Sequence, residues 1–454
     1  MRPDALIVRR LAGALALLVL ARPGLAADLM ADCRPDEATR CWQAAINGAR
    51  PPGRETWFAG IAARPEARYV IRDTIEVESA WGGVIDGNGA VLEWQGPPDR
   101  PLFLVKNTQQ VTFTNLRILA GTPLEAAFEF TKAPYGRDPE RNVAPSLNVI
   151  DGVRIEGVKL GNLKYGVRFS KKYGIDEDND QSTIINTAIY NVTEAAISIE
   201  HSQSQGHHFY AVKASGAPGN KDAAFVRALG GSFSSLGGFH GRFNGAVYDI
   251  HAAFGNDLIL DENSEASARL LRTPGGMASF PLPVQVIGGR FAVDNLAADG
   301  RIVDFQRMGP LSITGLKVTG ESLPDGVTPR ISFRPQPVPA PDARDAYGQF
   351  MLSGLSVTVP GSSGWELVEV SPAARVTIEG SSCADAKQRV TACSGLAAGV
   401  RAPQGPAFRD LPAGLADGHE AWCADCGAEA GSGRCSAGGP GRTARKRADG
   451  WYCD

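Results

Sequence analysis

Short runs of alternating apolar and polar residues recur along the chain in an eight-residue pattern. The clearest copy is residues 311–318, with apolar side chains at the first, third, sixth and eighth places and Gly315 at the fifth. Residues two apart in a strand share a face, so each copy predicts two short strands with one side buried. Glycine at the fifth place lets the chain bend between the two strands.

Other copies of the pattern occur from residue 111 onward. Close copies begin at Val111, Val153, Val284 and Phe350, and weaker ones begin at Ser182, His207, Tyr248 and, truncated, at Val376. A strand pair that buries only half its residues is not stable alone, so the copies must stack around one shared apolar interior. The pattern therefore predicts an all-β parallel β-helix. A β-sandwich would show hairpin turns at shorter spacing, and a propeller would show a near-constant blade period.

Both ends of the chain differ from this pattern. Residues 36–46 predict an amphipathic helix with Asp36 as its N-cap, and this helix would close the open end of the apolar interior. Beyond residue 400 the pattern is lost. The predicted domains are a signal peptide (1–26), an N-terminal cap with the first strands (27–80), the parallel β-helix (81–400) and a Cys-rich C-terminal module (401–454).

The first 26 residues predict export. Arg2, Arg9 and Arg10 precede the apolar run 11–20, and residues 24–26 form a small-x-small cleavage site. No stretch reaches the roughly 18–20 apolar residues that a membrane span needs. We expect a periplasmic or secreted protein.

Charge and cysteine content limit the partners. With 46 Lys and Arg against 49 Asp and Glu, the net charge of -3 predicts no general attraction to nucleic acid or membranes. Eight cysteines in an exported chain predict disulfides, with Cys33 and Cys41, and Cys383 and Cys393, each closing a local loop. The remaining cysteines form either disulfides or a structural zinc site, and export favours disulfides; they are Cys423, Cys426, Cys435 and Cys453.

The order of a capping helix, the turn Gly-Val-Ile-Asp-Gly-Asn-Gly at 83–89 and stacked copies resembles the pectin-lyase-like superfamily. These are right-handed parallel β-helix proteins and include pectate lyases, polygalacturonases, uronate epimerases and phage tailspikes. The resemblance implies a groove that binds a polysaccharide. Of the polygalacturonase motifs, only residues 239–242 approach one, Gly-His-Gly, and the lyase and epimerase motifs are missing. The resemblance therefore leaves the subfamily open.

Stacked copies would place equivalent residues in columns about 4.8 Å apart. Five of the eight seventh places are cationic, and the eight are Arg117, Lys159, Ala188, Lys213, Phe254, Arg290, Lys317 and Ser356. Arg154 and Glu156 occupy outward places of the copy at Val153. These residues predict binding of an acidic polysaccharide; alternatively, the cations only solvate an outward strand.

One group of outward residues predicts catalysis by β-elimination. His208, Tyr210 and Lys213 belong to the copy at His207, and Asp249 and His251 belong to the copy at Tyr248. In β-elimination a cation neutralises the uronate carboxylate, a His or Tyr base removes the C5 proton, and an acid protonates the leaving oxygen. We therefore favour a polysaccharide lyase.

Two alternatives remain open. Asp257, Asp261, Glu262 and Glu265 could supply the carboxylate pair of a glycoside hydrolase, but a solvated turn capped by Asp and Asn is the favoured explanation of this segment. A non-catalytic polysaccharide-binding scaffold is the other alternative. The acidic run 176–180 imitates the start of a calcium loop but lacks its later Gly and Glu, so calcium is only an alternative to a solvated loop, and no metal ligand is assigned. The oligomeric state is left open.

Overall fold

The computed structural model describes most of the chain between residues 33 and 453. The described residues are 33, 37–50, 57–134, 144–172, 179–251, 256–274, 283–306, 310–334, 349–362, 365, 367–370, 375–384, 390–392, 420–423, 426–429, 432–437 and 442–453. The predicted signal peptide and Asp36 lie outside them. The chain divides into an N-terminal unit, residues 1–191, and a C-terminal unit, residues 192–454.

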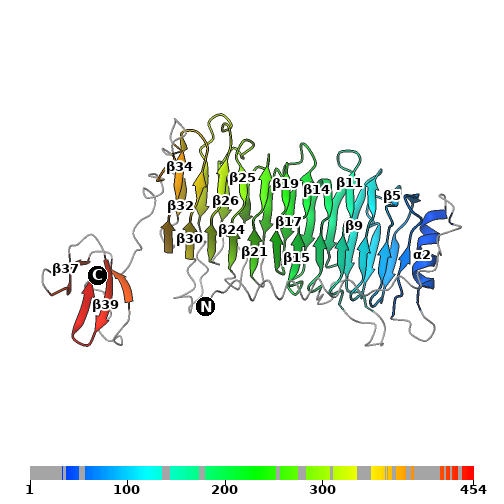
Figure 1. Cartoon of the computed structure of the whole chain (residues 1–454), viewed down its shortest axis with the longest axis horizontal. Helices are drawn as coiled ribbons and strands as arrows, with labels where there is room; N and C mark the ends of the chain where they lie inside the picture. The colour runs from blue at the N-terminus through cyan, green and yellow to red at the C-terminus, as the bar shows by residue number, and fades with distance from the viewer. Residues whose placement is uncertain are drawn as a thin grey trace. The chain divides into compact units, whose positions relative to one another are not determined.

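Parallel strands stack coil upon coil in the N-terminal unit (Figure 1). Each coil contributes one strand to each of three ladders. The first ladder is β1 (Ile61–Ala62), β4 (Val84–Asp86), β7 (Thr112–Thr114), β10 (Val149–Asp151) and β13 (Thr183–Ile185). The second is β2 (Arg68–Ile71), β5 (Val91–Trp94), β8 (Arg117–Ala120), β11 (Arg154–Gly157) and the start of β14 (Ala188–Ile199). The third is β3 (Ile75–Glu78), β6 (Phe103–Lys106), β9 (Leu124–Thr131) and β12 (Leu163–Phe169).

The C-terminal unit repeats this arrangement. Its first ladder is β15 (His207–Tyr210), β18 (Phe233–Leu236), β21 (Asp257–Leu260), β24 (Val284–Ile287), β27 (Leu311–Thr314), β30 (Gln349–Ser353) and β33 (Arg375–Glu379). Its second is β16 (Lys213–Gly216), β19 (Phe239–Gly241), β22 (Asn263–Glu265), β25 (Arg290–Ala292), β28 (Lys317–Thr319), β31 (Ser356–Val357) and β34 (Ser382–Ala384), with β35 (Val390–Ala392) antiparallel to β34. Its third is the end of β14, β17 (Ala224–Ala228), β20 (Ala246–Ile250), β23 (Leu271–Thr273), β26 (Arg301–Phe305), β29 (Arg330–Phe333) and β32 (Val368–Val370).

This stacking confirms the predicted right-handed parallel β-helix. Most copies of the eight-residue pattern lie in the predicted register: Leu311 faces Phe350, and Lys317 faces Ser356. The bend between the two strands of a copy has the left-handed backbone that glycine favours, with φ of 68° at Gly315 and 62° at Gly354. Asn115 adopts the same conformation, with φ of 54°, as asparagine tolerates better than most residues.

The copy predicted at Val153 is wrong by five residues. Val149 faces Thr112 and Arg154 faces Arg117, so this copy begins at Asn148. Asn148 occupies an inward place, where it is buried and its Oδ1 accepts a hydrogen bond of 3.1 Å from Val111 N. A polar residue in an apolar place concealed the true start, and Lys159 consequently lies outside the seventh-place column.

The copy predicted at Tyr248 is also wrong. Its strand, β20, lies in the third ladder between β17 and β23. The pattern missed two copies of the first ladder, which begin at Phe233 and Asp257. Asp257 is fully buried in an inward place and accepts a 3.1 Å hydrogen bond from Phe233 N.

The N-terminal end of the solenoid is closed by helix α2 (Ala38–Gly48), as predicted. Trp42 is fully buried and packs edge-on against Tyr69, with ring centroids 5.8 Å apart. Gln43 pairs with the outer edge of β3 as a strand would. Its Nε2 donates to Glu76 O at 3.0 Å, and its Oε1 accepts from Glu76 N at 2.8 Å.

A small C-terminal module follows the coils in sequence. It contains β36 (Glu420–Cys423), β39 (Arg442–Arg447) and β40 (Gly450–Cys453) in one antiparallel sheet, and β37 (Cys426–Ala428) paired with β38 (Cys435–Ala437). Its fold is held by the disulfide Cys435–Cys453. Among the described residues, no helix is long and apolar enough to cross a membrane.

The predicted disulfides are confirmed where the structure describes them. Cys33 is bonded to Cys41, and Cys383 and Cys426 are also oxidised. The sulfur atoms of Cys426, Cys435 and Cys453 lie within 4.8 Å of one another, but all three are in disulfides. They offer no thiolate to zinc, so the zinc alternative is not supported.

Candidate active site on the third ladder

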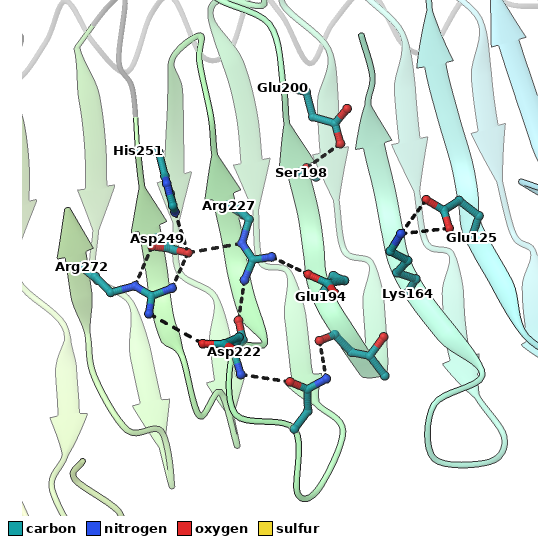
Figure 2. Close-up of polar contacts among 12 residues, drawn as sticks. Glu125, Lys164, Glu194, Ser198, Glu200, Asp222, Arg227, Asp249, His251 and Arg272 are labelled. Atoms are coloured by element: carbon teal, nitrogen blue, oxygen red, sulfur yellow. Dashed lines mark hydrogen bonds and ion pairs between the residues drawn. The ribbon is translucent and has the colours of Figure 1, made fainter. Parts of the chain in front are cut away.

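The third ladder of the C-terminal unit carries a column of polar side chains on the face opposite to the apolar interior (Figure 2). The strand register aligns Ser198, Arg227, Asp249, Arg272, Asp304, Ser332 and Glu369. Four successive members alternate in charge from Arg227 to Asp304. Neighbouring residues of this column are about 4.8 Å apart, so each carboxylate lies beside a guanidinium.

Asp249 is the centre of this column. It is fully buried, and Arg272 binds it through two nitrogens, with Nε 2.8 Å from Oδ1 and Nη2 2.7 Å from Oδ2. Arg227 Nε donates to Oδ2 at 3.3 Å from the other side. Arg227 also donates to Glu194 at 2.6 Å, which extends the network along the ladder.

Charge and hydrogen bonding keep Asp249 ionised. Burial opposes ionisation, but the hydrogen bonds from Arg272 and His251 outweigh it and lower the pKa of the carboxyl well below its usual range. The carboxylate also raises the pKa of Arg272 through that hydrogen bond. Asp249 is therefore a fixed negative charge rather than a proton donor.

His251 lies at the surface and contacts this buried carboxylate. It follows β20 by one residue, its side chain is 39% exposed, and its Nε2 lies 3.1 Å from Asp249 Oδ2. An ionised carboxylate only accepts hydrogen bonds, so Nε2 carries the hydrogen and Nδ1 keeps its lone pair. A carboxylate in this position orients an imidazole and stabilises it after it takes up a proton.

The other predicted catalytic residues lie elsewhere. His208 and Tyr210 are on β15 in the first ladder, and Lys213 is exposed on β16 in the second. The predicted proximity of these three to Asp249 and His251 is wrong, because β20 belongs to the third ladder. His208 Nδ1 pairs with Ser234 Oγ at 2.9 Å, and its ring stacks on Tyr210 at 5.8 Å. Burial lowers the pKa of His208 and raises that of Tyr210.

Apart from Lys159, the predicted polysaccharide-binding residues lie beside other charged residues of their own unit. In the N-terminal unit Arg117 and Arg154 are neighbours, and Glu156 lies 3.9 Å and 3.0 Å from their guanidiniums. In the C-terminal unit Arg290 lies beside Lys317 and pairs with Glu265 at 3.2 Å. Each group thus contains a carboxylate that reduces its positive charge.

The predicted acidic pair for hydrolysis does not form a surface group. Asp257 and Glu262 are buried, and Glu262 binds Ser235 and His240 at 2.6 Å and 2.7 Å. Both acids occupy inward places of their copy, whereas Asp261 and Glu265 face solvent. Two of the four carboxylates are therefore out of reach of a polymer.

Sequence reasoning missed the arginines on either side of Asp249. Arg227 stands between Val226 and Ala228, and Arg272 stands between Leu271 and Thr273; a single charge inside a short strand was their only signal. A second charged group was missed in the N-terminal unit, where Lys164 Nζ and Arg168 Nη1 each lie 3.1 Å from Glu125 Oε1. Figure 2 draws the contact between Lys164 and Glu125.

The N-terminal unit also has a polar cavity of about 550 Å³ beside α2. Its lining is Gln43, Asn47, Arg50, Asp73, Thr74, Glu76, Glu78 and Arg100. Arg100 pairs with Asp73 at 2.7 Å, and Lys106 pairs with Glu76 at 2.9 Å. No predicted site residue lines this cavity.

Residues 176–178 of the calcium alternative lie outside the described part of the chain.

The strand register defines a parallel β-helix, and comparison with known proteins gives similar folds only among solved structures of low identity. No protein-family model matches the chain, and no curated protein matches its sequence. A solved structure with 13% identity and a TM-score of 0.45 is DFA-IIIase from Arthrobacter chlorophenolicus A6, in which the match covers 82% of this chain and 97% of that one. The endo-xylogalacturonan hydrolase of Aspergillus tubingensis matches at 10% identity and a TM-score of 0.35, over 77% and 90%. The tailspike of Acinetobacter phage vb_AbaP_AS12 matches at 10% and 0.34, over 87% and 64%.

Proposed function

We propose that this protein is a carbohydrate-active enzyme, a lyase that cleaves an acidic, uronate-containing polysaccharide by β-elimination. The observation that carries this proposal is the pairing of buried, ionised Asp249 with exposed His251 beside Arg227 and Arg272. A long outward column of polar residues suits a linear polymer, because successive rungs offer similar contacts to successive sugars.

His251 is the general base of this reaction. Its Nδ1 removes the proton from C5 of the uronate, and Asp249 stabilises the resulting imidazolium. The electron pair of the C–H bond forms the C4–C5 double bond as the C4–oxygen bond breaks. The imidazolium then returns the proton to the leaving oxygen, so the imidazole ends the reaction neutral.

Arg272 supplies the positive charge that elimination needs. A guanidinium has five N–H donors, and Asp249 uses two of the nitrogens of Arg272. The remaining nitrogen, Nη1, lies 3.9 Å from Asp222, whose side chain is 74% exposed. A substrate carboxylate that binds this nitrogen would lose part of its charge, which makes the C5 proton more acidic.

Hydrolysis is less well supported by the same residues. A glycoside hydrolase needs two carboxyl groups on either side of the scissile bond, one of them protonated. The pKa of Asp249 is lowered and its side chain is buried, while Asp257 and Glu262 face the interior.

The oxidised cysteines support an exported protein, as the predicted signal peptide at 1–26 requires.

Incubation with a panel of acidic polymers tests the proposal. Polygalacturonate, alginate and hyaluronan would each be followed by ultraviolet absorbance of an unsaturated uronate and by assay of new reducing ends. A lyase yields both signals on at least one polymer. Reducing ends without absorbance would indicate a hydrolase, and binding without either product would indicate a scaffold; both results would overturn the proposal.

A further inference from the structure

We propose that Asp304, Gln306 and Arg334 form a second sugar-binding subsite, which holds a uronate of the same polymer two rungs from His251. This inference rests on the proposed function for the path of the polymer along the third ladder. The subsite repeats the arrangement at Asp249, with glutamine in place of histidine. Two rungs span about 10 Å, because neighbouring strands are about 4.8 Å apart. That spacing is close to the length of two sugar residues in an extended chain.

The first half of the repeat is a buried carboxylate with a polar side chain two residues later. Asp249 is followed by His251, whose Nε2 lies 3.1 Å from Asp249 Oδ2. Asp304 is 5% exposed and is followed by Gln306, whose Nε2 donates to Asp304 Oδ2 at 2.9 Å. The two carboxylates belong to one column, with Arg272 on the rung between them. The same face of the ladder thus presents the same contact twice.

The second half of the repeat is an arginine that reaches back one rung to the carboxylate. Arg272 on β23 donates to Asp249 on β20 at 2.7 Å. Arg334, which follows β29, donates from Nη2 to Asp304 Oδ1 on β26 at 2.8 Å. The backbone N–H of Arg334 donates to the carbonyl of the residue before Gln306, so these two residues are neighbours in the register. A guanidinium and an amide therefore lie side by side at the outer face.

Both side chains have hydrogen-bonding groups that the protein does not use. The side chain of Arg334 is 32% exposed, and within the described residues its ion pair and hydrogen bond both go through Nη2. Its Nε is buried without a partner there. Nη1 therefore remains to donate a charge-assisted hydrogen bond to a substrate carboxylate. Gln306 uses an amide N–H on Asp304, which leaves its Oε1 to accept from a sugar hydroxyl.

The charges of the subsite are balanced before substrate binds. Asp304 Oδ2 also lies 3.8 Å from Nη1 of Arg269, and that arginine pairs with Asp299 at 3.0 Å. Arg334 and Arg269 thus each have a carboxylate partner, as Arg272 has at the reaction centre. Hydrogen-bond geometry rather than excess positive charge therefore determines the ligand. A guanidinium beside an amide matches the carboxylate and a neighbouring hydroxyl of a uronate.

Gln306 makes this copy a binding site rather than a second reaction centre. Its amide does not take up a proton near neutral pH, whereas an imidazole does. The second sugar along the chain carries a carboxylate in a uronate homopolymer, and also in a polymer that alternates uronate with a neutral sugar. A uronate bound at Arg334 would therefore fix the position of the uronate at His251. Gln306 and Arg334 are thus specificity-determining residues for the reaction.

Equilibrium binding by the full chain tests this inference. A His251→Gln protein, which leaves the ligands intact, would be titrated with disaccharides and hexasaccharides of galacturonate, alginate and hyaluronan. Only a hexasaccharide spans both reaction centre and subsite, so for one polymer we expect it to bind at least about tenfold more tightly than the disaccharide. Gln306→Ala and Arg334→Gln, each added to this protein, should remove most of that gain. Lys213→Gln removes one charge from the exposed face of the second ladder and should change the gain by less than about twofold.

Further measurements separate this role from misfolding and from the lyase reaction. Gln306→Ala removes no charge and leaves the ion pair of Asp304 and Arg334 in place, so its urea midpoint should stay close to that of the parent protein. An unchanged gain in both subsite variants would overturn the inference. An equal loss in Lys213→Gln, or no binding of any of the three hexasaccharides, would overturn it as well. Product assays on the unmodified protein are independent of these titrations. A gain that needs Gln306 and Arg334, without product from any polymer, would refute the lyase reaction and leave the subsite standing.

Discussion

Two outward faces of the C-terminal unit each carry a histidine, but only one has the neighbours needed for acid–base chemistry. On the first ladder, His208 pairs with the neutral hydroxyl of Ser234. On the third ladder, His251 pairs with the ionised carboxylate of Asp249. The hydrogen-bond partner, rather than the histidine itself, decides whether the imidazole is merely packed or is oriented and stabilised as a cation.

The surroundings of the two histidines also differ in polarity. Along the fourth place of the first ladder, Tyr210 is followed by Leu236, Leu260 and Ile287, and the last of these is 40% exposed. This face has an apolar column where the third ladder has alternating charges. An apolar face disfavours the charged form of His208, in agreement with its lowered pKa.

Replacing each histidine by glutamine gives the largest difference between the faces. We expect His251→Gln to lower turnover of the acidic polymer by about 10²–10⁴-fold, the usual contribution of a general base. His208→Gln should change it by less than about threefold, because no ionised group orients His208. Initial rates at saturating polymer provide the measurement. A larger loss with His208→Gln would place the reaction on the first ladder.

Removing the charge of Asp249 should destabilise the protein strongly. Asp249→Asn leaves Arg227 and Arg272 mostly buried without their shared carboxylate, which we expect to cost about 3 kcal/mol of unfolding free energy. Asp222→Asn is the matched control, because that side chain is 74% exposed, and its cost should be below about 0.5 kcal/mol. Urea denaturation measures both. Similar values for the two variants would contradict the central role given to Asp249.

The two faces should also respond to acid in different pH ranges. Both Asp249 and His208 have a pKa lowered by folding, so the unfolded chain binds more protons and acid reduces stability. The contribution of His208 is lost as the pH falls below its usual value of 6.5, and that of Asp249 only below 3.8. His208→Asn should therefore flatten the stability curve just below pH 6.5, by about 1 kcal/mol or less. Asp249→Asn should leave this part of the curve unchanged and flatten only the more acidic part.

The smallest effect is expected in the apolar column. Ile287 is 40% exposed, so Ile287→Thr should change the unfolding free energy by less than about 0.5 kcal/mol and leave turnover unchanged. Thermal denaturation and the polymer assay check this. A marked loss of turnover would show that the apolar face takes part in function, and the contrast between the faces would then be wrong.

The first and second ladders were largely predictable from the sequence, whereas the third was not. Their strands alternate between buried and exposed residues, as in Leu311–Thr314, so the period of two is visible. Strands of the third ladder such as Ala246–Ile250 are buried throughout, and their pattern does not reveal which residue faces outward. Asp249 and His251 were identified from the sequence as candidate catalytic residues, but they were assigned to the wrong ladder.

Buried polar residues explain the remaining errors of register. Asn148 and Asp257 occupy inward places where the pattern expects an apolar side chain, and each is compensated by a hydrogen bond to a backbone N–H of the preceding coil. Such a bond joins neighbouring coils, so its two residues are far apart in the sequence. The sequence of one coil alone therefore does not show that the residue is tolerated there.

The pairing of Gln43 with β3 has a consequence for how these molecules behave at high concentration. The terminal coil of a stacked solenoid presents unsatisfied backbone groups that could recruit the end of another molecule. Gln43 fills two of these positions at Glu76 with a side-chain amide, which has no further strand to offer. Helix α2 thus blocks end-to-end association of molecules at this edge. Its loss would expose backbone groups of the terminal coil that template aggregation.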